Sequence, residues 1–185
     1  MSAPLLRGFP PVVDDHARVL ILGSFPSALS LATGQYYANP RNAFWPIAGE
    51  IFEFDASAPY DTRLAVLRSH GVALWDVLHA CRRVGSADSA IEPRSLVVNK
   101  FGALFADYPA ITRVYFNGAK AAELYRRLAE TVGGVRYERL PSTSPAHAIR
   151  RSDKLAAWRA TASIASAALG APPACGGPGE AGRRQ

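Results

Sequence analysis

Cysteine is scarce in this chain of 185 residues, which has only Cys81 and Cys175. The long separation of the two matches none of the short spacings that are typical of thiolate metal sites. An iron–sulfur cluster also needs about four protein ligands, which two thiolates cannot supply. We therefore expect neither a metal nor another cofactor.

Long apolar runs are missing as well. No stretch of the sequence approaches the roughly 18 apolar residues of a membrane span. The first residues, 1–11, lack the basic segment followed by an apolar segment that marks a secretory leader. We expect no membrane association and a cytoplasmic location.

Acidic residues are outnumbered, and lysine is rare among the basic ones. The chain has 21 Lys and Arg against 15 Asp and Glu, a formal net charge of +6, and its only lysines are Lys100, Lys120 and Lys154. Arginine therefore carries most of the positive charge. Guanidinium groups match phosphate oxygens, so this balance suits a polyanionic partner, although charge alone does not identify it.

The length limits the number of domains. With 49% hydrophobic residues, the chain can form one domain with a sizeable core but is too short for two ordinary ones. We assign residues 1–170 to a single domain and expect it to be a monomer. Residues 171–185 are rich in proline and glycine and have no apolar face, which predicts a disordered tail.

Strands and helices are predicted to alternate along the domain. Short apolar segments predict strands at 18–22, 72–77, 111–116 and 135–140, and the last alternates apolar with polar residues, as an edge strand does. Helices are predicted at 42–54, 61–69, 94–105, 119–131 and 153–169, the last with Ser152 as its N-cap and Gly170 at its end. Parallel strands need helical crossovers, so we expect a three-layer α/β/α sandwich around a mostly parallel sheet of about four strands.

Polar loops follow the first and the last of these strands. Residues 23–27 (GSFPS) lead on to residues 35–45 (QYYANPRNAFW), and residues 140–147 (LPSTSPAH) end the last strand. Open α/β sheets bind ligands beyond the carboxyl ends of their strands. The two loops therefore predict one shared site.

Together with residues 75–77 (WDV) and 116–118 (FNG), and in this order, the loops resemble the active-site motifs of the uracil-DNA glycosylase superfamily. The resemblance is greatest to its DNA-deoxyinosine (hypoxanthine-DNA) glycosylase branch and covers roughly residues 17–160. It implies a fold of the same three-layer type and an enzyme of base excision repair. Such an enzyme flips a deaminated base, uracil or hypoxanthine, out of DNA and hydrolyses its glycosidic bond, which leaves an abasic site.

The resemblance assigns base-binding roles to four residues. Tyr37 matches the aromatic that stacks on the flipped base, or else it is a core tyrosine. Asn117 offers a donor beside an acceptor, complementary to the adjacent C=O and N–H of uracil and hypoxanthine, or else it forms an Asn-Gly turn. Ser27 replaces a bulky tyrosine of strict uracil enzymes and leaves a roomier pocket, or else it caps a helix. Phe25 stands where relatives carry a catalytic aspartate or asparagine.

Catalysis must then rest on other residues, because Phe25 can neither position water nor stabilise charge. The asparagine with that duty in the deoxyinosine branch matches Asn39, so we expect Asn39 to position the water, with Ser24 as a helper. An asparagine is not a base at neutral pH, which implies reliance on transition-state electrostatics. His147 is expected either to donate a hydrogen bond to the leaving base or to face solvent and touch a phosphate.

Contacts to the DNA backbone are expected around the two loops. The hydroxyl-rich segment Ser142, Thr143 and Ser144 can bind phosphates, although it could instead be an ordinary helix-capping turn. Ala146 would approach the space that the flipped base leaves. Arg41 and Arg150 flank the loops and could meet phosphates, or else belong to a solvated surface.

Two other functions remain open from the sequence. Ser24, His147 and Asp153 could form a serine hydrolase, but the Gly-x-Ser-x-Gly elbow is missing and the order of His and Asp is unusual. The chain could also be a silent module that binds a damaged base without releasing it. No lysine lies in the loops to serve as an amine nucleophile, so a glycosylase here would be monofunctional, without a lyase step.

Overall fold

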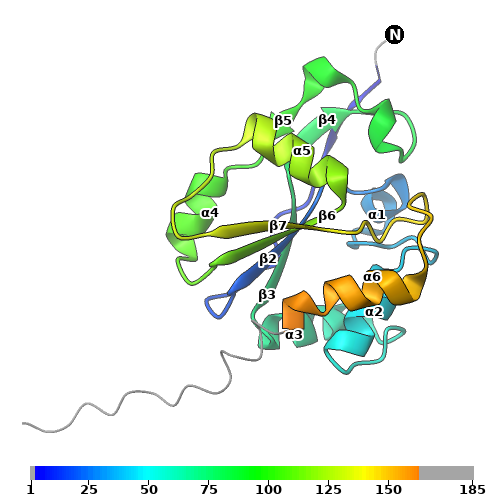
Figure 1. Cartoon of the computed structure of the whole chain (residues 1–185). Coiled ribbons are helices and arrows are strands. Elements are labelled where there is room, and N and C mark those ends of the chain that lie inside the picture. The colour runs from blue at the N-terminus through cyan, green and yellow to red at the C-terminus, as the bar shows by residue number, and fades with distance from the viewer. Residues whose placement is uncertain (1–2, 163–185) are drawn as a thin grey trace, which may run out of the picture.

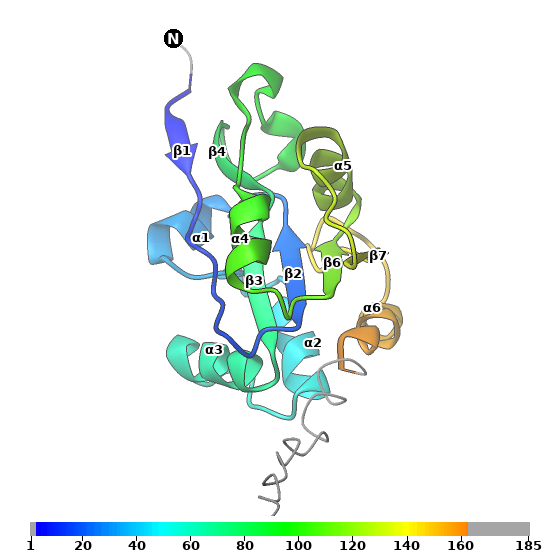
Figure 2. The same cartoon turned by 90° about the vertical axis from the view of Figure 1, so that its left-hand side faces the viewer.

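The computed structural model describes residues 3–162, and its centre is a four-stranded sheet (Figure 1). The strands are β2 (Val19–Gly23), β3 (Val72–Asp76), β6 (Arg113–Asn117) and β7 (Arg136–Leu140). They lie side by side in the order β3-β2-β6-β7, and all three neighbouring pairs are parallel (Figure 2). The predicted parallel sheet and the predicted edge position of the last strand are confirmed.

Helices cover both faces of this sheet (Figure 1). One face packs against α4 (Phe101–Asp107) and α5 (Ala119–Leu128), the other against α2 (Phe44–Ile51), α3 (Tyr60–Ser69) and α6 (Arg151–Trp158). Successive side chains of a strand point to opposite faces. Leu20 and Leu22 of β2 accordingly belong to the first core, and Val19 and Ile21 to the second. The three-layer sandwich is confirmed.

A second, smaller sheet was not predicted. It consists of β1 (Leu5–Arg7), β4 (Leu78–Arg82) and β5 (Val97–Val98) in the order β1-β4-β5, with antiparallel pairs. Short 3-10 turns, η1 (Asp88–Ala90) and η2 (Pro93–Ser95), lie between β4 and β5. The helix expected over 94–105 is therefore wrong in its first half, because the β-branched pair Val97–Val98 joins β4 and the helix begins only at Phe101.

Two helix starts also differ from expectation. The last helix begins at Arg151 with Arg150 as its N-cap, not after Ser152. A short helix, α1 (Ala28–Thr33), follows β2 and was not predicted, since its few residues carry no clear apolar periodicity. The predictions for Gly170 and for the tail 171–185 fall outside the described residues.

The strand register brings the predicted loops together. Gly23 pairs with Asp76 across β2 and β3, and Asn117 pairs with Leu140 across β6 and β7. The carboxyl ends of all four strands therefore lie at one edge of the sheet, where both polar loops begin. Separately, no helix within residues 3–162 is long and apolar enough to cross a membrane.

Candidate active site

A cavity of about 580 Å³ opens at this edge of the sheet. Its wall includes residues that follow β2, the ends of β3 and β6, the loop before η1 and the connection between β7 and α6, which runs beside α1 in Figure 1. The predicted site residues on the wall are Ser24, Phe25, Ser27, Tyr37, Asn39, Asn117, Ser142, Thr143, Ser144, Ala146 and His147. The predicted loops thus form one site, and of the predicted residues Arg41 and Arg150 lie outside the lining.

Tyr37 is a rigid part of the wall. Its ring stacks on Phe44, with centroids 3.9 Å apart and planes 20° from parallel, and its backbone has the left-handed φ of 55°. The neighbouring Tyr36 amide donates to the Tyr60 hydroxyl (2.9 Å), which fixes the segment. The Tyr37 hydroxyl is buried without a hydrogen-bond partner among residues 3–162, and burial, followed by the charge of Asp76, raises its pKa.

Asn117 is held by Thr143 of the last loop. The Asn117 Nδ2 donates to Thr143 Oγ1, and the Thr143 amide donates to Asn117 Oδ1, both at 2.8 Å. Thr143 is 0% exposed. The expected contact of its hydroxyl with a DNA phosphate is therefore wrong, because this buried group is already bound to Asn117. Asn117 keeps one N–H and one lone pair for a base.

Helix α6 supports the same loop from behind. Lys154 Nζ donates to the Ser144 carbonyl (3.1 Å), and Trp158 Nε1 donates to the Pro141 carbonyl (2.9 Å). Within the loop, Ser142 Oγ accepts from the Ser144 amide at 3.2 Å. Sequence reasoning missed this role of Lys154, although Lys154 and Trp158 are four residues apart and so share one face of the helix.

Three predicted site residues follow β2, and each has different surroundings. Phe25 is buried, with the Arg83 guanidinium 5.1 Å from the centre of its ring. Ser27 is the N-cap of α1, and its hydroxyl accepts from the Ser30 amide (3.1 Å), so the capping alternative holds while Ser27 also lines the cavity. The Ser24 hydroxyl donates to Asp88 Oδ1 at 2.7 Å, so its hydrogen-bond acceptor is a carboxyl oxygen and not a histidine.

Asn39 and His147 lie at different depths. The Asn39 Oδ1 accepts from the Arg41 amide at 2.9 Å, which fixes the side chain in a half-buried turn. His147 is exposed at the rim. Arg41 and Arg150 are exposed, and Asp153, which pairs with Arg150 at 3.5 Å, does not line the cavity that Ser24 lines.

Two carboxylates on the wall were missed as site residues. Asp76 ends β3 and is only 4% exposed, and burial, with a smaller contribution from Asp88, raises its pKa to about 8 against the opposing effect of Arg83. Burial also raises the pKa of Asp88, while the Ser24 hydrogen bond and Arg83 oppose that rise. An ionisable residue at the end of an otherwise apolar strand was a signal for Asp76, whereas Asp88 begins the short turn η1, where no sequence signal marked it.

Arg83 connects the loops around these acids. Its Nη2 donates to the Pro26 carbonyl (2.5 Å) and its Nε to the Gly85 carbonyl (3.0 Å), and the side chain is buried. The arginine therefore fixes the loop before η1 against the loop after β2. Within the described part of the chain, no group of three or more His, Cys, Asp or Glu side chains could hold a metal ion.

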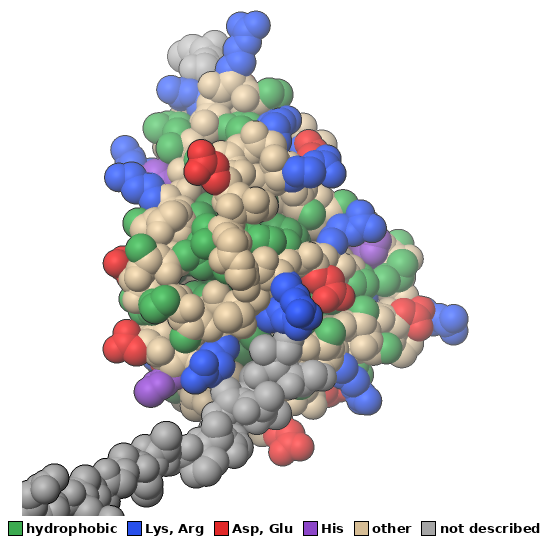
Figure 3. All heavy atoms as spheres, turned by 60° about the vertical axis from the view of Figure 1, so that its left-hand side comes forward, with side chains coloured by type: hydrophobic (Ala, Val, Ile, Leu, Met, Phe, Trp, Pro, Cys, Tyr) green, Lys and Arg blue, Asp and Glu red, His purple; other side chains and the backbone are tan. Residues whose placement is uncertain are grey.

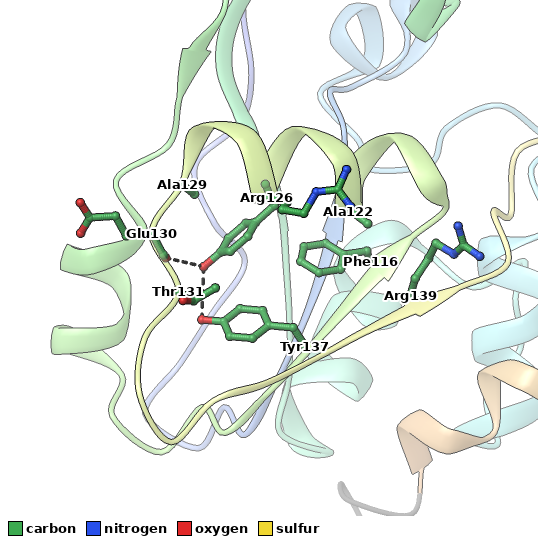
Figure 4. A pocket seen from close by; sticks show the side chains of 9 residues that line it. Phe116, Ala122, Arg126, Ala129, Glu130, Thr131, Tyr137 and Arg139 are labelled. Carbon is green, nitrogen blue, oxygen red and sulfur yellow. Dashed lines mark hydrogen bonds between the residues drawn. The ribbon is translucent and has the colours of Figure 1, made fainter.

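A second cavity, of about 720 Å³, lies between α5 and β7 (Figure 4). The ring centroids of Tyr125 and Tyr137 are 5.4 Å apart there, and the Tyr125 hydroxyl donates to the Glu130 carbonyl at 3.2 Å. None of the predicted site residues lines it.

On the face that Figure 3 shows, basic side chains stand apart with acidic ones among them and form no continuous basic patch. Neither this face nor the second cavity brings the predicted site residues together, so the cavity at the strand ends is the candidate active site.

Known proteins resemble this chain over most of its length. The model of the uracil DNA glycosylase superfamily matches residues 10–165. A hypoxanthine DNA glycosylase of Methanosarcina barkeri is 38% identical over 149 residues, which are 80% of this chain and 90% of the relative. A protein of the same name from Methanosarcina acetivorans is 39% identical over 157 residues, 83% of this chain and 96% of the relative.

A solved structure agrees with these relatives. The solution NMR structure of a Methanosarcina acetivorans protein, described as a candidate uracil DNA glycosylase, superimposes with a TM-score of 0.69 at 36% identity. The match covers 85% of this chain and 99% of that one. The chain therefore belongs to the uracil DNA glycosylase superfamily and is a DNA glycosylase.

Proposed function

We propose that this DNA glycosylase removes hypoxanthine, and also uracil, from DNA by hydrolysis and leaves an abasic site. One observation carries the proposal: the aromatic ring of Tyr37, the amides of Asn39 and Asn117 and the loop 142–147 line a single cavity at the strand ends. The two Methanosarcina relatives carry the name hypoxanthine DNA glycosylase, which supports hypoxanthine as the first substrate to test. Uracil shares its adjacent C=O and N–H, which supports it as a second substrate.

The flipped base is expected to stack on Tyr37. The Phe44 ring behind Tyr37 supports it at 3.9 Å, so little side-chain freedom is left to lose when a base binds. Stacking is tolerant of base identity because every base has a π face. Selection among bases must therefore come from polar groups at the base edge.

Asn39 is the proposed water-positioning residue. Its Oδ1 is held by the Arg41 amide, and its second lone pair and its Nδ2 can orient a water at the sugar. Asparagine does not remove a proton at neutral pH, so the rate depends on stabilising the charge of the transition state. Ser24 helps by holding the Asp88 carboxylate on the wall, where negative charge favours the developing positive charge of the sugar.

The rim is the proposed DNA contact. Ser142 and Ser144 are half-buried, and Ala146, His147 and Arg150 are exposed along the same segment. Arg41 is exposed on the opposite loop, two residues beyond Asn39. These groups would meet phosphates around the flipped nucleotide. A cytoplasmic location and a monomeric state stay predictions.

We infer a monofunctional enzyme. Among residues 3–162 no lysine lines the cavity, and the nearby Lys154 donates to the Ser144 carbonyl. An amine nucleophile for strand cleavage is therefore not in place.

The proposal is tested by base release from labelled oligonucleotides that carry one hypoxanthine, uracil, xanthine or normal base, as duplex and as single strand. We expect strand breakage at hypoxanthine and uracil only after alkali, and about 100-fold less in Asn39→Ala. Full activity in Asn39→Ala would contradict its assignment. DNA binding without release of any base would support the silent module instead.

A further inference from the structure

Strand β7 is an edge of the central sheet, and its outer side is open to another strand. Among residues 3–162 it pairs with β6 alone. The Arg136 amide donates to the Thr112 carbonyl at 2.9 Å, so Arg136 directs its backbone groups toward β6. Because successive residues of a strand alternate in this respect, the N–H and C=O groups of Tyr137 and Arg139 point away from β6. An edge of this kind is a template for pairing with another chain.

The same two residues line the second cavity, of about 720 Å³, between β7 and α5. The Tyr137 ring lies 6.3 Å from the Phe116 ring, with planes 15° from parallel, and 5.4 Å from the Tyr125 ring. Ala122 of α5 adds to this apolar lining. A cavity of this size with aromatic walls can take a large apolar side chain. The free backbone groups and the apolar cavity therefore lie beside each other.

Two arginines in the lining are available to a partner. Arg126 and Arg139 are exposed, and neither belongs to an ion pair among residues 3–162. In Figure 4 the Arg126 side chain points toward the end of the cavity where Arg139 lies, and the Glu130 carboxylate lies at the opposite end. Guanidinium groups match carboxylates in shape and charge. The end of the cavity near Arg139 therefore suits an acidic partner.

We propose that the edge of β7 and the cavity beside it bind an extended acidic peptide segment of a partner protein. The segment pairs with the outward backbone groups of Tyr137 and Arg139 as a fifth strand and places a large apolar side chain in the cavity. Its carboxylates meet Arg126 and Arg139. This role goes beyond base removal, because none of these three residues lines the cavity at the strand ends.

Two other occupants suit the site less well. DNA would use the arginines, but its sugar-phosphate backbone cannot continue a β-sheet. A second copy of this chain would bring its own exposed Arg136 and Arg139 to the same edge, and like charges across paired strands destabilise the pairing. Both occupants remain outcomes of the test.

The first step of the test selects a ligand for the full chain. A phage library of random peptides of about ten residues, the length of a long strand, is selected on the immobilised protein. We expect the enriched peptides to combine a large apolar residue with two or more acidic ones. No enrichment, or enrichment without acidic residues, would overturn the proposal.

The second step places the tightest enriched peptide on the protein. Its affinity should fall more than about tenfold in Arg139→Glu. The control Arg94→Glu makes the same charge change at an exposed position that lines neither cavity, and it should bind the peptide as the wild type does. Equal affinity for wild type and Arg139→Glu would contradict the proposed site.

Hydrogen exchange measured by NMR tests the strand pairing itself. When the peptide saturates the protein, the amides of Tyr137 and Arg139 should exchange at least about tenfold more slowly. The Arg136 amide, already bonded to Thr112, should change little. Unchanged exchange at Tyr137 and Arg139 would overturn the proposal. Slow exchange at both amides before peptide is added would also overturn it, because a second copy or another part of this chain would then occupy the edge.

DNA assays separate this proposal from the proposed function. Arg139→Glu should release bases from short duplexes at the wild-type rate. A loss of affinity for undamaged duplex in both Arg126→Glu and Arg139→Glu would assign the arginines to DNA and overturn the peptide site. Peptide binding by a protein that releases no base would instead contradict the proposed hydrolysis and leave the peptide site standing.

Discussion

Asn117 and Thr143 are joined by two hydrogen bonds of 2.8 Å that run in opposite directions. They tie the end of β6 to the loop before α6, two segments that lie far apart in the sequence. The loop also accepts hydrogen bonds from Lys154 and Trp158 of α6. Its position over the cavity is therefore held from the sheet and from the helix.

Removal of the Thr143 hydroxyl should loosen this loop. Thr143→Val keeps the shape of the side chain but leaves Asn117 Nδ2 without its acceptor, so we expect a loss of about 1–3 kcal/mol in the free energy of unfolding. KM for lesion-containing DNA should rise more than kcat falls, because the rim moves while the rest of the wall stays. Thr143→Ser, which keeps the hydroxyl, is the control, and equal behaviour of the two variants would contradict the role of the hydrogen bond.

The ring and the hydroxyl of Tyr37 should have separable effects. Tyr37→Phe removes a buried hydroxyl that has no hydrogen-bond partner within residues 3–162. The free energy of unfolding should therefore stay the same or increase by up to about 1 kcal/mol. Base release should persist. Tyr37→Ala removes the stacking surface and should weaken lesion binding by about 1–3 kcal/mol. Binding can be measured with a duplex that carries 2′-fluorinated deoxyinosine, which resists hydrolysis. Equal damage from both changes would show that the hydroxyl contacts the substrate.

The protonation of Asp76 should also appear in the stability of the protein. Its pKa is raised to about 8 from an ordinary value of 3.8, so the native state keeps a proton that the unfolded chain has lost. The contribution of Asp76 to the free energy of unfolding should therefore fall as pH rises from about 4 to about 8 and be constant outside that window. Urea denaturation of Asp76→Asn should show a flatter dependence of the free energy of unfolding on pH in that range. Asp15→Asn, which changes an exposed acid outside the cavity, is the control. Identical profiles for wild type and Asp76→Asn would mean that Asp76 is ionised in the native protein.

Gly23→Ala should destabilise the site through one side chain. The added Cβ would overlap Asp76 Oδ1, and we expect a loss of about 1–3 kcal/mol in the free energy of unfolding together with weaker base release. The double variant Gly23→Ala, Asp76→Ala should lose less stability than the sum of the single ones. Gly102→Ala in α4 is the control, because its Cβ meets open space and should stabilise the helix slightly. Additive losses would argue against the overlap.

Much of the fold was predictable because each central strand has a recognisable local pattern. Residues 19–23, 72–76 and 113–117 are mostly apolar, residues 136–140 alternate apolar with polar side chains, and polar loops follow the first and the last of these strands. The structure of segment 78–98 was not predictable, because its strands pair with β1 and with each other. The sequence of a short strand does not identify the strand with which it pairs.

The sequence predicted which residues line the cavity better than it predicted what each of them does. The segment before α2, the end of β6 and the loop before α6 were correctly placed at one site. The anchoring of Asn117 depends on Thr143, and the burial of Asp76 depends on the register with Gly23. Both are long-range relationships that a reading of adjacent residues does not contain.

The close approach of Gly23 to Asp76 has an evolutionary consequence. A Cβ at position 23 would overlap Asp76 Oδ1, so a larger residue there requires the acid to move or to be replaced. A lineage that replaced the glycine first would displace the acid in the cavity wall, whereas one that shortened the acid first would make room at position 23. The order in which the two positions change therefore decides whether the cavity wall is distorted in the intermediate.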